Sequence, residues 1–139
     1  MTKIVYNACH GGFSVSNAAM LRYAEIKGIT LYTRKNMFGM TDCYFCPPEE
    51  YDRISAEEKA MPVSPGRFAR SNALYFSDRD FERNDPVLVQ VVEELGDKAN
   101  GSFAELRIID IPAGTRYRFE EYDGWESVMT EVDYEWEVA

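Results

Sequence analysis

The sequence predicts an α+β fold in which two main helices pack on a largely antiparallel β-sheet. Two segments place apolar residues at helical spacing, at residues 17–27 and from residue 86 onward. Segments rich in β-branched and aromatic residues flank the first of these helices and fill the chain after residue 104. The chain has 139 residues, which is enough for one domain with a buried core. We therefore expect a single domain over residues 1–139.

The first elements are expected in the order strand, glycine turn, helix, strand. Residues 3–8 form the first strand segment, and the glycines at 11–12 interrupt it. The helix over 17–27 is followed by Gly28, at the position typical of a C-terminal cap. Residues 29–34 alternate between apolar and polar side chains and are expected to form the second strand.

Residues 36–72 are expected to form an irregular insertion between core elements. Four of the six prolines of the chain fall within this range. The segment from Ser55 to Glu58 matches a capping box and predicts one or two helical turns. An irregular segment of this length is typical of a lid, a partner contact or a mobile loop.

The second main helix is predicted from a strong start signal. After a short strand candidate at 73–76, Asp85 and Pro86 supply an acidic N-cap and a proline at the first helical position. An apolar stripe follows, formed by Val87, Leu88, Val91, Val92 and Leu95. This stripe predicts a helix that packs on the core and ends near residues 100–101.

The rest of the chain is expected to be β-structure. Residues 105–111, 116–122 and 125–132 are predicted strands, and the Asp-Gly pair at 123–124 is a hairpin turn signal. The tail, residues 133–139, is acidic and aromatic. We expect this tail to pair with another strand or to dock on a partner.

Charge limits the classes of partner. The net charge is −9, and residues 101–139 hold ten acidic and three basic residues, a net charge of −7. Direct binding of DNA or RNA is not expected, because the negative field repels phosphates. No run of 18 apolar residues occurs, so no membrane span is expected. The N-terminal segment lacks a signal-peptide core and the three cysteines are an odd number, which together favour a cytoplasmic location.

The turn Gly11-Gly12-Phe13-Ser14 is the best candidate for binding an anion. A glycine turn that leads into a helix N-terminus points free backbone N–H groups at one place, and the helix dipole adds positive charge there. Ser14 or Ser16 is expected to cap the helix and could add a donor. The turn lacks the lysine and the third glycine of nucleotide fingerprints. The alternative is an ordinary capped turn.

The charged segment 77–85 precedes the second helix. Arg79 and Arg83 could clamp phosphates, while Asp80 or Asn84 could hydrogen-bond a ribose or a base edge. The alternative is that these charges pair with each other on a solvated loop. Exposed ion pairs contribute only about 0–1 kcal/mol, so stability alone is a poor reason for them.

Arg116 and Arg118 are expected on one face of a strand, with Tyr117 on the other. With neighbouring aromatic residues they could form a wall on which bases stack. The alternative is a cross-strand charged face in which these arginines oppose Glu120 or Glu126.

Metal and catalytic sites have weak support in the sequence. Cys43 and Cys46 form half of a zinc motif, and Cys9 with His10 could supply two more ligands. Neighbours on a strand point to opposite faces, which makes joint ligation by Cys9 and His10 awkward and argues against their acting as a catalytic dyad. No known catalytic motif occurs. We expect a protein that is not an enzyme and needs no cofactor.

Three parts of the chain together resemble a widespread group of small proteins encoded by phages and prophages. These are the pattern NxCxGGFxxS within 3–16, the pattern SDxDxxRxDP opening 77–96, and 106–112 with EEYDG at 120–124. The phage setting that this resemblance implies suggests, by analogy, a sponge for the nucleotide second messengers of CBASS- and Thoeris-type bacterial defence. Such proteins usually form homo-oligomers and act in the cytoplasm of the infected cell.

The leading hypothesis is therefore an anti-defence protein that sequesters a cyclic oligonucleotide or an ADP-ribose derivative without cleaving it. The expected ligand-binding residues are Tyr6, Asn7, Gly11, Gly12, Phe13, Ser14, Arg79, Asp80, Arg83, Asn84 and Tyr117. One alternative is an interaction protein that inhibits a host factor through the acidic residues 101–139, by blocking it or by mimicking nucleic acid. The other alternative is a small phage enzyme that acts on a nucleotide.

Overall fold

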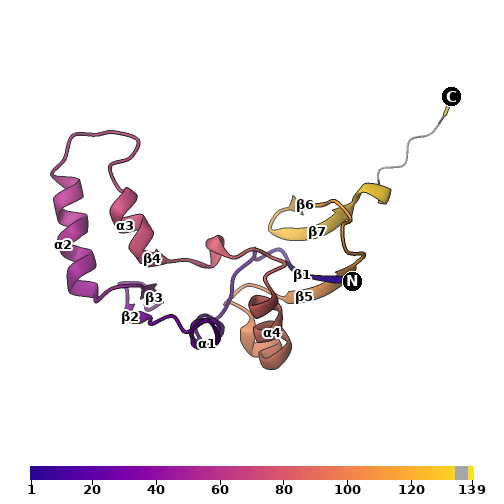
Figure 1. Cartoon of the computed structure of the whole chain (residues 1–139), viewed down its shortest axis with the longest axis horizontal. Helices are drawn as coiled ribbons and strands as arrows, with labels where there is room; N and C mark the ends of the chain where they lie inside the picture. Colours follow the sequence, from indigo (N-terminus) through magenta and orange to yellow (C-terminus); the bar gives the residue numbers. More distant parts are fainter. Residues whose placement is uncertain (134–137) are drawn as a thin grey trace. The chain divides into compact units, whose positions relative to one another are not determined.

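The computed structural model describes residues 1–133 and 138–139 (Figure 1). The fold is α+β, as the sequence predicts, and all strand pairs in the described residues are antiparallel. The chain groups into two compact units, where the sequence suggests a single domain. Unit 1 comprises Met1–Tyr23 and Phe81–Ala139, and unit 2 comprises Ala24–Asp80.

Strand β1 lies at the centre of unit 1. The described elements of this unit are β1 (Thr2–Asn7), α4 (Pro86–Leu95), η2 (Gly96–Ala99), β5 (Leu106–Ile111), β6 (Tyr117–Tyr122), β7 (Trp125–Thr130) and η3 (Glu131–Asp133). Strands β1 and β5 pair side by side, with Ile4 opposite Ile109 (Figure 1). Strand β1 also contacts α4 and β7. Ile4, Val5 and Val91 are fully buried and form the centre of the core.

The two main helices begin where the sequence predicts. Helix α1 (Asn17–Lys27) has the predicted bounds; it begins in unit 1 and ends in unit 2. At the start of α4 the carboxylate of Asp85 accepts a hydrogen bond from the Val87 N–H at 2.8 Å, as an N-cap should. The same carboxylate accepts a 2.5 Å hydrogen bond from the Tyr23 hydroxyl, which together with burial raises the pKa of Tyr23.

The hairpin of β6 and β7 confirms the predicted turn. Asp123 and Gly124 both have positive φ, 48° and 86°, as a two-residue hairpin turn with the right twist requires. Tyr122 and Trp125 are therefore direct cross-strand neighbours. The tail predicted to dock, residues 133–139, includes 134–137, which lie outside the described residues.

Unit 2 corrects the expectation of an irregular insertion. Its elements are β2 (Tyr32–Lys35), β3 (Thr41–Tyr44), α2 (Pro48–Lys59), α3 (Ala69–Leu74), β4 (Tyr75–Phe76) and η1 (Asp78–Asp80). Strands β2, β3 and β4 form one antiparallel sheet in that order. Much of 36–72 is thus regular, and the capping-box residues from Ser55 to Glu58 lie inside α2 rather than at its start.

A buried carboxylate joins the two helices of unit 2. Glu58 of α2 is only 1% exposed. Its carboxylate accepts hydrogen bonds from both the backbone N–H and the hydroxyl of Ser71 on α3, each at 2.8 Å. These bonds compensate the cost of removing the carboxylate from water, which explains why a glutamate is tolerated there.

Candidate functional site

Backbone from distant segments packs against the predicted anion-binding turn. A Cβ atom at Gly11 would lie 1.6 Å from the carbonyl oxygen of Phe103. A Cβ atom at Gly124 would lie 2.4 Å from the carbonyl oxygen of His10 and 2.7 Å from the nitrogen of Gly12. The glycines at these positions let two backbone segments touch. The backbone of Phe103 therefore occupies the space beside Gly11, whereas a Cβ atom at Gly12 would meet no atom within 4 Å.

The first turn of α1 is also closed by the protein. Ser16 is the cap: its hydroxyl accepts a hydrogen bond from the Ala19 N–H at 3.1 Å and donates to the carbonyl of Lys98 at 2.6 Å. Ser14, the other predicted cap, is half-buried and accepts a 3.0 Å hydrogen bond from the Gly101 N–H at its carbonyl. The Ala19 N–H, one of the backbone donors at the start of α1 that an anion would need, is therefore already bonded to Ser16.

Arg83, the predicted phosphate clamp, forms a bidentate ion pair within the protein. Its two terminal nitrogens lie 2.6 and 2.8 Å from the two carboxylate oxygens of Glu126 on β7. The side chains of Arg83 and Glu126 are 18% and 10% exposed. The guanidinium also lies 3.4 Å over the ring of Phe13 and 4.9 Å over that of Phe119. The positive charge at this corner is thus balanced by a carboxylate.

Asn7 completes the same network at the end of β1. It is fully buried. Its side-chain amide donates to the carbonyls of Cys9 at 2.7 Å and Gly124 at 2.9 Å, and its side-chain oxygen accepts from the Glu105 N–H at 2.8 Å. Its backbone N–H donates to Glu126 at 2.9 Å. Asn7 therefore ties β1 to the hairpin and to the segment before β5.

The other predicted ligand-binding residues are divided between the two units. Tyr6 and Tyr117 are half-buried and Asn84 is exposed, all in unit 1. Arg79 and Asp80 are exposed on η1 in unit 2. The structure thus brings together Asn7, Gly11, Gly12, Phe13 and Arg83, as a packed corner of unit 1.

Arg116, just before β6, and Arg118, on β6, pair with carboxylates, although neither forms a predicted cross-strand pair. Arg116 lies 3.1 Å from Glu131, and Arg118 lies 3.3 Å from Glu120 on its own strand. Across the hairpin, Arg118 is opposite Met129. Glu126, one of the two predicted partners, is held instead by Arg83.

The four candidate zinc ligands lie in different units. Cys9 and His10 belong to unit 1, while Cys43 and Cys46 are buried in unit 2. The Cys9 thiol donates to the Phe103 carbonyl at 3.0 Å, whereas the His10 ring lies against the hairpin. Within residues 1–133 and 138–139, no three His, Cys, Asp or Glu side chains are grouped to hold a metal ion.

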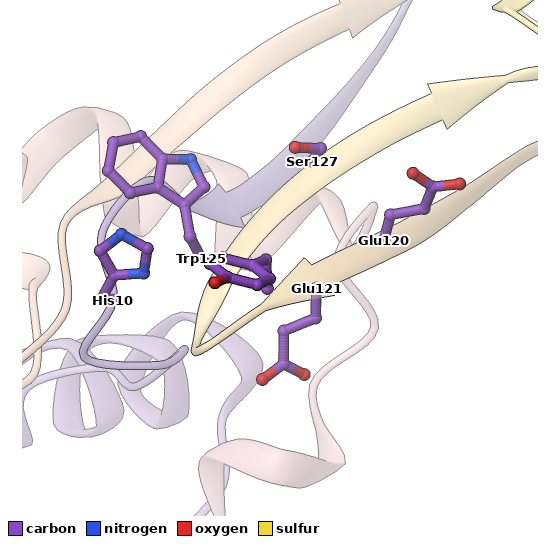
Figure 2. A pocket seen from close by; sticks show the side chains of 6 residues that line it. His10, Glu120, Glu121, Trp125 and Ser127 are labelled. Atoms are coloured by element: carbon purple, nitrogen blue, oxygen red, sulfur yellow. The ribbon is translucent and has the colours of Figure 1, made fainter.

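An open cavity of about 430 Å³ lies at the turn of the hairpin (Figure 2). Its lining residues are His10, Glu120, Glu121, Tyr122, Trp125 and Ser127. The His10 ring is edge-on to two aromatic rings, at 5.2 Å from Trp125 and 6.1 Å from Tyr122. Tyr122 is 79% exposed and Trp125 is 43% exposed. Single exposed apolar residues need no explanation, but adjacent exposed aromatic rings that line a cavity are a candidate binding surface.

Two contacts hold the hairpin turn beside this cavity. The His10 Nδ1 lies 3.2 Å from the Asp123 carbonyl. Because a carbonyl only accepts, Nδ1 is the donor in this contact. Glu121 accepts a 3.2 Å hydrogen bond from the Gly124 N–H. The turn therefore holds both His10 and Glu121 in place through hydrogen bonds.

Sequence reasoning did not identify this cavity as a site. The sequence suggests His10 only as a weak metal ligand or a partner of Cys9, while Tyr122 and Trp125 fall within the acidic segment 101–139. A usable signal was present, because the residues that flank a two-residue Asp-Gly turn must face each other across the hairpin. The contribution of His10 comes from a segment more than a hundred residues away in the chain, which no local pattern reveals.

No helix within the described part of the chain is long and apolar enough to cross a membrane. Comparison of the chain with protein-family models, with curated proteins and with solved structures found no match.

Proposed function

We propose that this chain is an interaction protein that blocks a partner protein through the outer face of the β6–β7 hairpin. We define this hairpin face as Glu120, Tyr122, Trp125 and Ser127, together with His10, which packs beside them. One observation carries the proposal: two large exposed aromatic rings stand next to carboxylates in a part of the chain with a net charge of −7. Aromatic side chains dominate binding energy at protein interfaces.

Charge identifies the kind of partner. An acidic surface attracts a basic one and speeds their encounter. In the phage setting that the resemblance implies, the partner would be a host factor whose basic groove is blocked by the hairpin face. No turnover is needed for such a role.

The test is a capture experiment in which the wild-type protein and its variants are immobilised and the proteins that each one retains are compared. Wild type is compared with Tyr122→Ala/Trp125→Ala and with the control Phe38→Ala, which removes an exposed ring from unit 2. The proposal expects proteins with basic surfaces to be retained by wild type and control, lost from the double variant, and released by high salt. Equal capture by all three proteins would contradict it.

The leading hypothesis from the sequence, sequestration of a nucleotide second messenger, stays a prediction. Arg83 is paired with Glu126, so a phosphate at this corner would have to displace the carboxylate. The test is incubation with cyclic dinucleotides, cyclic trinucleotides and cyclic ADP-ribose isomers, followed by denaturation. Release of intact ligand would support sequestration, and release of cleaved ligand would support the enzyme alternative. Native mass spectrometry of the same sample tests the expected homo-oligomer.

A further inference from the structure

The cavity at the hairpin turn combines aromatic walls with a negative rim. Tyr122 and Trp125 are partners on the two strands of the hairpin. The His10 ring lies beside Trp125, edge-on to it (Figure 2). Glu120 extends from the same face of β6 as Tyr122, two residues earlier. A ring face is electron-rich, so a cation beside it is attracted both by the rings and by the carboxylate.

The local charge favours a cation over an anion. Of the residues that line the cavity, Glu120 and Glu121 carry negative charge and none is a lysine or an arginine. Arg118 is a basic residue in contact with Glu120, at 3.3 Å, and both side chains are more than half exposed. An ion pair that exposed contributes about 0–1 kcal/mol, so exchange of Arg118 for an incoming cation costs little.

We propose that this cavity binds the guanidinium group of an arginine side chain on the partner protein. The proposal deepens the proposed function and rests on the hairpin face being the interface. The guanidinium would lie flat against Trp125 or Tyr122 and donate from its edge to the Glu120 carboxylate.

Arginine fits this site better than lysine does. Its guanidinium is planar and stacks on an aromatic face while its N–H groups point outward in the ring plane toward acceptors. It is also more weakly hydrated than an ammonium group, so less water binding is lost on contact with the rings. An open cavity of about 430 Å³ leaves room for the side chain to enter from solvent.

The test compares three blocked tripeptides that differ only at the central residue: arginine, lysine and citrulline. Citrulline has nearly the same shape as arginine but no charge. The titration uses the full chain carrying Trp136→Phe, so that Trp125 is the one remaining tryptophan of the two in the sequence. The arginine peptide is expected to change the Trp125 fluorescence with a saturable curve. The citrulline peptide is expected to bind roughly twofold to thirtyfold more weakly, the range of a lost cation–π contact.

Matched variants separate a local contact from the overall charge. Glu120→Gln and Glu131→Gln each remove one negative charge from unit 1, but Glu131 lies outside the cavity. Arginine binding should weaken with Glu120→Gln and with Tyr122→Ala, and should not change with Glu131→Gln. Because Tyr122 is exposed, its replacement leaves the fold intact.

Two results would overturn the inference. One is equal binding of the arginine and citrulline peptides, and the other is equal weakening by the two glutamine variants. If either occurs while partner capture still depends on Tyr122 and Trp125, this inference fails but the proposed function stands. If partner capture does not depend on these residues either, both fail.

Discussion

Glu126 on β7 holds Arg83 in a bidentate ion pair across the edge of β1, with nitrogen–oxygen distances of 2.6 and 2.8 Å. The same carboxylate accepts from the Asn7 backbone N–H, and the Arg83 carbonyl accepts from the Val5 N–H at 2.8 Å. Together these groups satisfy the backbone N–H groups of Val5 and Asn7 on the edge of β1 that β5 does not cover. The pair therefore joins the hairpin to the core and engages the guanidinium that the sequence suggests as a phosphate clamp.

Breaking this ion pair on one side should destabilise the protein strongly. Arg83→Met leaves the Glu126 carboxylate without its cation, and an uncompensated charge at such a site costs about 3–5 kcal/mol. The free energy of unfolding, measured by urea denaturation, checks this value. The double variant Arg83→Met/Glu126→Leu should recover part of the loss, because neither charge remains. A single-variant loss below about 1 kcal/mol would show that the pair is not structural.

Asn7 should matter for stability and not as a ligand contact. Asn7→Ala leaves the Glu105 N–H and two carbonyls without partners, and each unsatisfied buried group costs about 1–3 kcal/mol. Thermal unfolding checks this expectation. Asn84→Ala, at an exposed residue from the same predicted site, is the control and should change stability by no more than about 0.5 kcal/mol. Equal effects of the two substitutions would contradict the network.

The close approach at the hairpin turn predicts a contrast between two glycines. Gly124 and Gly114 have similar positive φ, 86° and 82°, so alanine at either position costs about 1–2 kcal/mol of backbone strain. A Cβ at Gly124 would also collide with the His10 carbonyl, whereas nothing lies within 4 Å of one at Gly114. Gly124→Ala should therefore be clearly the more destabilising in urea and should alter the Trp125 environment. Similar losses for both would contradict the backbone contact.

Alkaline pH should weaken unit 2 through Tyr75. Burial and a 3.0 Å hydrogen bond to Asp42 raise the pKa of Tyr75 from its usual 10.0 to about 12. The folded state therefore holds this proton more tightly, and its contribution to stability is present below pH 10 and is lost as the pH rises to about 12. The difference in unfolding free energy between wild type and Tyr75→Phe should shrink over this range. The same comparison for Tyr32→Phe, at an exposed tyrosine, is the control.

The sequence predicts those features that depend on local signals. Asp85 followed by Pro86 fixes the start of α4, and the Asp-Gly pair at 123–124 fixes the hairpin turn, because both set backbone geometry within a few residues. The prolines at 47 and 48 are also local signals, but they lead to the wrong expectation of an irregular segment. Pro48 opens α2 instead of preventing it, since proline is favoured at the first helical position.

The candidate site could not be predicted because it depends on contacts between distant segments. In the sequence, Arg83 and Glu126 belong to separate charged segments with different expected roles, and only folding places them together, 43 residues apart. His10 reaches the hairpin across 113 residues. Local sequence patterns indicate periodicity and turns, but they do not show which charged residues form ion pairs with each other.

The most direct test of the account is an amide and indole NMR titration of the labelled full chain with the arginine and citrulline tripeptides. The account predicts shifts from the arginine peptide that centre on His10, Glu120, Tyr122 and Trp125, with little response to citrulline. Shifts centred instead on Gly11 to Ser14 and Arg83, or an equal response to both peptides, would contradict it.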